Sequence, residues 1–391
     1  MSRIAIVTAT RAEYGILTPL IKAVSEDDEL DLDLIVTGTH LSEKHGKTVD
    51  FIKKDGFTIA HQIPILVDGN DAEAISITMS NALINFAACF KKDRPKMVVI
   101  LGDRTEMLSV AVAAMNECIP IVHIHGGEVT EGAVDDCIRH ALTKMSYLHF
   151  ASTEVYKNRI IQLGEHPERV YNVGALSTEN ILKVTLMSER EVRENVGIPE
   201  SGKYAVVTFH PVTLEDATAT EETLSLCKAM DRYQDIFFLI TMANADVGGD
   251  LVNEILKGYV KDNEHAILVP NLGMKRYLSA VKYANFVLGN SSSGLIEAPV
   301  LGTPTVNIGD RQNGRLMADS VINCTSNESD ICQAIDSALR MTHTPSYMYG
   351  NGDTSRRMIA IMKKYISEDR VNLKKGFFDI GSIENDRKVI N

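Results

Sequence analysis

Short apolar runs alternate with longer amphipathic stretches along the first half of the chain. The runs are rich in β-branched residues and are apolar at successive positions, which is typical of strands covered on both faces. We predict strands at 4–8, 33–36, 97–101, 120–124, 147–151 and 170–173. Helical patterns between them cover 13–25, 72–92, 105–116, 135–145 and 154–163. This alternation predicts repeated βαβ units and the α/β class.

The same alternation restarts after a polar stretch. Residues 185–202 are rich in Glu and Arg and close on Pro199-Glu200-Ser201-Gly202, which predicts a short helix followed by an interdomain connection. Further strands are predicted at 204–209, 236–241, 266–269, 286–288 and 305–308. Helices are predicted between them at 220–233, 250–259, 274–280 and 294–301, and a last one at 355–367.

Two doubly wound, Rossmann-like domains facing across a cleft account for this pattern and for the length of 391 residues. We predict a first domain at 1–184 and a second at 203–367, whose last helix is a candidate to pack back on the first domain. Residues 368–391 are predicted to be a polar tail, frayed from Lys374 onward. Open α/β sheets bind ligands at the carboxyl ends of their strands, so functional residues are sought there.

Charge and composition narrow the choice of partners. The chain has 40 Lys and Arg against 52 Asp and Glu, a net charge of −12, which gives no general attraction to nucleic acid or to an anionic membrane. No run approaches the roughly 18 apolar residues of a membrane span, and no signal-peptide pattern opens the chain. Six cysteines without a C-x-x-C pair suit reduced thiols. We therefore predict a cytoplasmic protein with no nucleic-acid or membrane partner.

Charged residues follow the first strand and the strand at 97–101. The run R-A-E-Y at 11–14 places Arg11 at a helix start, where backbone N–H groups favour an anion, although an exposed turn Arg is an equally good interpretation. G-D-R-x-E at 102–106 places Asp103 and Arg104 after a buried strand. Asp103 could instead cap the following helix.

A second acidic group follows the next strand. It consists of H-I-H-G-G-E at 123–128 and D-D-x-I-R-H at 135–140, and so includes His125, Glu128 and Asp135. Acids in different environments can divide the roles of acid and base. His123 could equally be a core histidine and Asp135 a helix cap. Metal binding by His123 and His125 with the nearby acids is a weaker alternative, because no further spaced ligands are present.

In the second half, groups that suit an anion follow the strands. His210 stands in H-P-V-T after one strand, and G-N-S-S-S-G at 289–294 opens a helix with Glu297 two turns in. Serine hydroxyls and free N–H groups suit a pyrophosphate, although a serine-rich cap is as good an interpretation. The segment is neither a Walker loop nor a G-x-G-x-x-G fingerprint. G-x-R-Q-x-G-R at 309–315 adds Arg311 and Arg315.

Acids in the first half and anion-binding groups in the second suggest sugar chemistry opposite a nucleotide diphosphate. The seven motifs, in this order over roughly residues 3–316, resemble the hydrolysing UDP-N-acetylglucosamine 2-epimerases of sialic acid synthesis. The resemblance implies a two-domain, glycosyltransferase-B-like fold. It implies a UDP-N-acetylhexosamine substrate and water as co-substrate, with release of UDP and N-acetylmannosamine through 2-acetamidoglucal. It favours a homodimer or larger homo-oligomer, with the helix at 72–92 as a candidate contact. We predict no cofactor and no metal, because Arg11, Arg104 and Arg311 could neutralise the diphosphate instead.

The resemblance also implies roles for residues. Catalytic roles fall on Asp103, His125, Glu128, Asp135 and His210, and substrate or UDP contacts on Arg11, Arg104, Asn244, Ser291, Ser292, Glu297 and Arg311.

Two positions depart from the family pattern. Several relatives have a catalytic Glu where this chain has His125, so His125 or Glu128 takes that duty. Nonhydrolysing relatives have a Lys at the position of Ile16, so one diphosphate contact is missing or falls to Arg11 alone.

Two alternatives stay open for the activity. One is the same chemistry on a UDP-2,4-diacetamido-trideoxyhexose, as in legionaminic acid synthesis, and the other is a glycosyltransferase of the same fold. A noncatalytic sensor of nucleotide sugars is disfavoured, because recognition alone needs no acid cluster. In an acidic molecule, a UDP-sugar requires the cations Arg11, Arg104, Arg311 and Arg315 to lie in one cleft.

Overall fold

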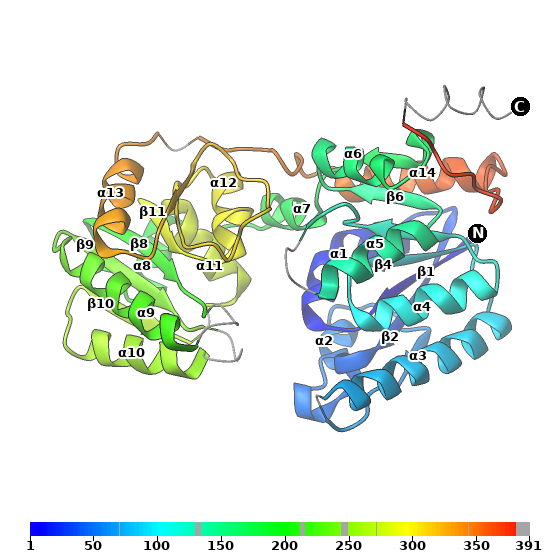
Figure 1. Ribbon diagram of the computed structural model, residues 1–391, viewed down its shortest axis with the longest axis horizontal. Coiled ribbons are helices and arrows are strands. Elements are labelled where there is room, and N and C mark those ends of the chain that lie inside the picture. Colours follow the sequence, from blue (N-terminus) through cyan, green and yellow to red (C-terminus); the bar gives the residue numbers. More distant parts are fainter. Residues whose placement is uncertain are drawn as a thin grey trace, which may run out of the picture. The chain divides into compact units, whose positions relative to one another are not determined.

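The computed structural model describes residues 1–69, 71–129, 134–211, 216–243, 249–270, 272–342 and 344–380. The chain divides into two compact units, one formed by Met1–Asn180 with Tyr349–Asn391 and the other by Ile181–Met348 (Figure 1). The second unit therefore interrupts the sequence of the first. Each unit contains a parallel sheet with helices between successive strands, which confirms the α/β class.

The first unit contains a seven-stranded sheet with the order β3-β2-β1-β4-β5-β6-β7. Its strands are β1 (Ser2–Thr8), β2 (Leu30–Thr37), β3 (His61–Ile63), β4 (Met97–Leu101), β5 (Ile121–Ile124), β6 (Leu148–Ala151) and β7 (Val170–Asn172). The order reverses between β1 and β4. The carboxyl ends of the strands beside such a switch point are where open α/β sheets bind ligands.

The helices of the first unit cover both faces of this sheet. They are α1 (Arg11–Ser25), α2 (Val49–Lys54), α3 (Ala72–Lys92), α4 (Thr105–Asn116), α5 (Val134–Met145), α6 (Glu154–Gln162), α14 (Thr354–Ser367) and α7 (Leu176–Lys183), which crosses into the second unit. Alternate residues of β1 enter two separate cores: Ile4 and Ile6 join one with α1 and α14, and Ala5 and Val7 join the other with α3 and α4. This two-sided burial explains why the strands are apolar throughout.

The second unit repeats the plan with six strands in the order β10-β9-β8-β11-β12-β13. The strands are β8 (Lys203–Thr208), β9 (Ile236–Thr241), β10 (Ala266–Val269), β11 (Phe286–Gly289), β12 (Thr305–Ile308) and β13 (Val321–Cys324). The helices are α8 (Glu189–Val196), α9 (Asp216–Asp231), α10 (Gly249–Lys261), α11 (Gly273–Tyr283), α12 (Glu297–Leu301) and α13 (Glu328–Ala338). Its switch point lies between β8 and β11.

The boundary between the units differs from the predicted one. Residues 185–202 contain α8, which begins with a capping box formed by Ser188 and Glu191. Val192 and Val196 on its inner face are buried in the same core as residues of α11. The charge-rich sequence conceals this narrow apolar face, so the second unit begins at Ile181 instead of 203.

The far boundary also differs, because α14 belongs to the first unit. Met358, Met362 and Tyr365 join the core that contains α1. At the start of α14, the backbone N–H and the hydroxyl of Ser355 both donate to the carboxylate of Glu179 at 2.6 Å. The second unit therefore ends at Met348 and not at 367.

The segment after α14 is fastened to the first unit, in contrast to the frayed tail predicted from Lys374 onward. Lys375 Nζ lies 2.9 Å from both carboxylate oxygens of Glu165 and 2.7 Å from the carbonyl oxygen of Ser146. The Glu165 side chain is 1% exposed and also lies 2.5 Å from Lys144 Nζ. The backbone N–H of Phe378 donates to Gly164. Residues 381–391 of the predicted tail lie outside the described residues.

Candidate active site

Arg11, Asp103 and His125 follow three neighbouring strands of the first unit, β1, β4 and β5. Arg11 is the first residue of α1, and its exposed guanidinium carbon lies 5.0 Å from the centre of the Phe51 ring. Asp103 follows β4 after Gly102, whose φ of 74° favours glycine. The candidates therefore gather beside the switch point of this sheet.

An ion pair joins Asp103 to Arg139 of α5. The Arg139 side chain is only 6% exposed, and its Nη1 donates to the carbonyl oxygen of Glu128 at 3.1 Å and to Asp136 Oδ1 at 3.4 Å. The alternative that Asp103 caps the next helix is wrong, because Arg104 occupies the N-cap position of α4 and makes no side-chain cap bond. The candidate residues did not include Arg139. The one sequence feature that could have pointed to Arg139 is its position as the arginine in the otherwise acidic motif at 135–140.

His125 and Glu128 form the next part of the same group. His125 has a left-handed backbone with a φ of 64°, and its Nδ1 lies 3.7 Å from Glu128 Oε1. That oxygen accepts a hydrogen bond of 3.1 Å from Ser152 Oγ. His125 Nε2 is buried and has no hydrogen-bond partner among the described residues. The carboxylate attracts the ring when the ring is protonated, and an imidazole can accept or donate a proton.

Arg104 brings a cation to the edge of this group. Its Nε and Nη2 donate to Glu106 Oε1 at 3.1 and 2.9 Å. Burial opposes the charge, but Glu106, Glu13 and Asp135 together hold the pKa of the guanidinium above its ordinary value. Asp135 itself is exposed in the first turn of α5.

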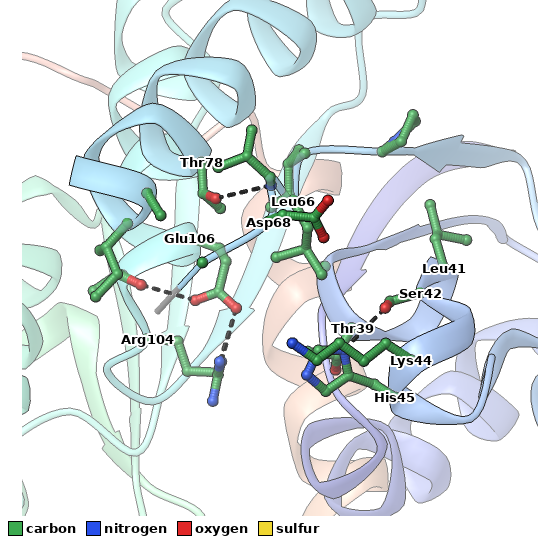
Figure 2. A pocket seen from close by; sticks show the side chains of 18 residues that line it. Thr39, Leu41, Ser42, Lys44, His45, Leu66, Asp68, Thr78, Arg104 and Glu106 are labelled. Atoms are coloured by element: carbon green, nitrogen blue, oxygen red, sulfur yellow. Dashed lines mark hydrogen bonds and ion pairs between the residues drawn. The ribbon is translucent and has the colours of Figure 1, made fainter. Parts of the chain in front are cut away.

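A cavity of about 530 Å³ opens beside Arg104 in the first unit. Figure 2 shows Arg104 and Glu106 on one side of it and Lys44 and His45 on the other. Among the candidate residues that the structure describes, only Arg104 lines this cavity; Asp103, His125, Glu128 and Asp135 do not. The polar segment 38–48 after β2, which supplies much of the wall, carries no motif from which the cavity could be predicted.

The H-x-H segment does not present two open imidazoles to a metal. Both ring nitrogens of His123 already have partners: Nε2 lies 2.7 Å from the Gly102 carbonyl oxygen, and Nδ1 lies 3.3 Å from Thr143 Oγ1. Among the described residues, no group of three or more His, Cys, Asp or Glu side chains is placed to hold a metal ion.

In the second unit, Asn290 links the candidates that follow β8, β11 and β12. Its Oδ1 accepts from the backbone N–H of His210, and its Nδ2 donates to the carbonyl of His210, both at 2.8 Å. The carbonyl oxygen of Asn290 accepts from Arg311 Nη1 at 3.1 Å and from Gln312 Nε2 at 2.8 Å. Preceding it, Gly289 has a φ of 133°, and a Cβ there would meet the Thr208 carbonyl oxygen at 2.0 Å.

The serine segment ends in two short helical pieces instead of the single helix predicted at 294–301. Ser291 caps a 3₁₀ turn at Ser292–Gly294, and α12 then begins at Glu297. Glu297 is therefore the first residue of its helix and does not lie two turns in. Its Oε2 is buried without a hydrogen-bond partner among the described residues, and burial raises the pKa of this carboxyl.

The remaining candidates are divided between the units. Arg11 and Arg104 belong to the first unit, and Arg311 and Arg315 to the second, so their meeting in one cleft stays a prediction. Asn244 and residues 212–213 of the H-P-V-T motif lie outside the described residues.

Comparison with known proteins gives consistent matches. Residues 22–363 match the family described as UDP-N-acetylglucosamine 2-epimerase. A Campylobacter jejuni protein named GDP/UDP-N,N'-diacetylbacillosamine 2-epimerase (hydrolyzing) is 43% identical over 84% of this chain and 85% of its own length. The Escherichia coli polysialic acid biosynthesis protein P7 is 37% identical over 97% of this chain and 98% of its own.

Solved structures agree at the level of the fold. The crystal structure of the Neisseria meningitidis UDP-GlcNAc 2-epimerase bound to UDP-GlcNAc has a TM-score of 0.78 and 18% identity, over 93% of this chain and all of that one (100%). The Methanocaldococcus jannaschii UDP-GlcNAc 2-epimerase has a TM-score of 0.76 and 20% identity, over 93% of this chain and 99% of that one. The two parallel sheets with alternating helices thus match the two-domain, glycosyltransferase-B-like fold.

Glu13 gives a prediction for stability. Its side chain is 6% exposed, and burial raises its pKa from 4.5 to about 7, although Arg104 acts in the opposite direction. Because the folded-state pKa lies above the unfolded one, stability falls as the pH rises from about 4.5 to about 7. Gln at this position cannot ionise. The free energy of unfolding of Glu13→Gln minus that of the wild type should therefore rise by up to about 3 kcal/mol from pH 4 to pH 8.

Chemical denaturation of the full chain at pH 4 and pH 8 measures this difference in the free energy of unfolding. Glu26→Gln, at an exposed position, is the control. Parallel pH dependence in wild type and Glu13→Gln would contradict the assignment.

Proposed function

The chain belongs to the UDP-N-acetylglucosamine 2-epimerase family, and we propose that it converts UDP-N-acetylglucosamine and water to UDP and N-acetylmannosamine for sialic acid synthesis. The hydrolysing 2-epimerases among its relatives support this activity. The observation that carries the proposal is the connected group of Asp103, Arg139, Glu128 and His125 beside the switch point of the first sheet.

The reaction requires a base, because the hydrogen at the sugar 2-position is not acidic. In our proposal a base removes this proton while the bond from the anomeric carbon to UDP breaks, which leaves 2-acetamidoglucal. Water then adds across the double bond with inverted configuration at the 2-position. A positioned acid or base typically accelerates such a step about 10²–10⁴-fold, and a carboxylate stabilises the positive charge at the anomeric carbon.

We assign these duties to the residues at the strand ends. Asp103 faces the developing positive charge, and His125 exchanges a proton through Nε2 while Glu128 orients its Nδ1. This choice places His125 in the role that a Glu has in several relatives. Asp135 and His210 are the other proposed catalytic residues.

UDP is proposed to bind mainly to the second unit. Hydroxyls of Ser291 and Ser292 with Arg311 suit the diphosphate, and the unpartnered Oε2 of Glu297 suits a ribose hydroxyl. Arg11 and Arg104 of the first unit and Asn244 complete the proposed contacts. No cofactor and no metal is part of the proposal.

The decisive experiment is turnover of UDP-N-acetylglucosamine in heavy water. We expect UDP and free N-acetylmannosamine that carries deuterium at its 2-position, because the proton that returns there comes from solvent. Absence of the free sugar, or of the label, would refute the proposal. Sugar transfer that depends on an added acceptor would instead indicate a glycosyltransferase.

A second candidate substrate is a UDP-linked 2,4-diacetamido-trideoxyhexose, used in legionaminic acid synthesis. It is favoured by two relatives named as diacetylbacillosamine 2-epimerases, at 43% and 33% identity. The chemistry at the 1- and 2-positions would be identical. Comparison of kcat/KM for the two UDP-sugars decides between them.

Asp103→Asn tests the assigned acid. We expect kcat to fall at least about 100-fold, because the neutral amide cannot stabilise the positive charge at the anomeric carbon, while the Kd of UDP stays within about twofold. Asp50→Asn on α2, which removes an exposed carboxylate, is the control. Lost UDP binding, or an unfolded protein, would show that Asp103 has a nucleotide-binding or structural role instead.

We further propose a cytoplasmic homodimer in which a second copy of the chain covers α3. Phe86 and Phe90 fix one side of this helix to the core, whereas Ile77 and Ile84 on the other side are 42% and 66% exposed. Within the described residues, α3 is also the one helix that is long and apolar enough to cross a membrane. Because its inner face belongs to the core, the narrow outer stripe suits a protein partner better than lipid.

Ile84→Glu tests this contact. We expect the molar mass from light scattering to change from that of a dimer to that of a monomer, because the partner would have to bury a charge. Val155→Glu, at an exposed apolar position of α6, should leave the mass unchanged. A monomeric wild type, or a dimer of Ile84→Glu, would refute the contact.

A further inference from the structure

His123 is a fully buried histidine in the middle of the candidate site. It is the third residue of β5 and is 0% exposed. Burial lowers its pKa from 6.5 to about 3, so the ring is neutral throughout the physiological range. A neutral imidazole carries one N–H, and the Gly102 carbonyl 2.7 Å from Nε2 can only accept. We therefore assign the proton to Nε2 and the lone pair to Nδ1.

The two partners of His123 belong to the two segments that carry the ion pair between Asp103 and Arg139. Gly102 immediately precedes Asp103. Thr143 lies one turn after Arg139 on α5, and its Oγ1 is 3.3 Å from Nδ1 and 3.0 Å from the Arg139 carbonyl oxygen. Both of these atoms only accept, so the single hydroxyl hydrogen donates to one of them at a time, and its donation to Nδ1 completes the bridge. The ring therefore bridges the turn that carries Asp103 and the helix that carries Arg139.

Gly126 leaves room for this bridge. A Cβ at this position would lie 3.0 Å from His123 Nδ1 and 3.0 Å from Thr143 Oγ1. The H-I-H-G-G-E motif thus contributes both the His123 ring and, at Gly126, the space beside its Nδ1. Because the ring is enclosed, moving it would remove the Nε2–H donor from the Gly102 carbonyl.

We propose that His123 is a positioning residue for the reaction, which holds the turn at Gly102 against α5 so that Asp103 keeps its place beside Arg139. This inference rests on the proposed function and deepens it. His123 does not touch the substrate, and it exchanges no proton. It acts through the carbonyl that its Nε2 holds.

A histidine that only stabilises the core would lose stability on substitution without a specific effect on turnover. His149 provides the matched control, because it pairs with His123 in register on β6 and is also 0% exposed. Its Nε2 lies 3.2 Å from Glu165 Oε2, so its partner is the carboxylate that fastens the segment after α14.

The experiment compares four variants at a temperature where each is folded. His123→Met removes the donor and should lower kcat about 10- to 100-fold, with KM and the Kd of UDP within about twofold. His123→Gln places an amide N–H near the position of Nε2 and should recover kcat to within about threefold of wild type. Thr143→Val keeps the shape but breaks the link to α5, and should lower kcat about threefold. His149→Met should lose thermal stability and keep kcat.

Two further measurements separate positioning from proton transfer. The pH profile of kcat should keep its shape in His123→Gln, because a neutral ring contributes no ionisation. Imidazole ¹⁵N spectra of the wild type should show His123 as the Nε2–H tautomer, without titration between pH 5 and pH 9.

Each result has a defined meaning. Wild-type kcat in His123→Met, or a His123→Gln as impaired as His123→Met, overturns the positioning role. If His123→Met does not fold, an unchanged kcat in Thr143→Val overturns the role equally well. A titrating or Nδ1–H tautomer refutes the bridge itself. A wild-type enzyme that turns over neither UDP-sugar overturns the proposed function, and the positioning role with it, whereas the spectra still report on the bridge.

Discussion

The pairing of Arg139 with Asp103 is the interaction on which the candidate site of the first unit depends. A guanidinium with so little exposure has to be compensated, because removal of one member of a buried pair typically costs about 3–5 kcal/mol. The compensation comes from the turn after β4, the carbonyl of Glu128 after β5, and Asp136 one turn earlier on α5. Arg139 therefore holds the turn after β4, the segment after β5 and the start of α5 at the same edge of the sheet. Without this cation, the carboxylates gathered there would repel one another.

The second unit achieves a similar convergence without a buried charge. The side chain and the carbonyl of Asn290 together join the segments after β8, β11 and β12. This link depends on a neutral amide and on the carbonyl oxygen that accepts from Arg311 Nη1 and Gln312 Nε2. The division of labour is consistent with acid–base chemistry on the first unit and diphosphate recognition on the second.

The fold could be predicted from the sequence wherever the chain shows a long apolar or periodic pattern. The predicted bounds of α3, α4, β4 and β9 are those of the structure, because such elements show long apolar or periodic patterns. The strands β3 and β13 were not predicted; each contains a polar residue and lies at an edge of its sheet. Such edge strands lack a continuous apolar run.

The site was predictable as a set of motifs but not as a set of contacts. Asp103 and Arg139 are 36 residues apart, and only the tertiary fold reveals that they pair. The contact between His125 and Glu128 also depends on the left-handed backbone of His125, which no local sequence pattern predicts.

The interrupted sequence of the first unit has a consequence for protein synthesis. The second unit is one continuous segment, whereas the core of the first unit is incomplete until Met358, Met362 and Tyr365 have been added. Domains generally fold as units while the chain emerges from the ribosome. The unit that begins at the N-terminus is thus the last to have its full sequence available. Until then, the part of α1 that packs against α14 lacks its cover.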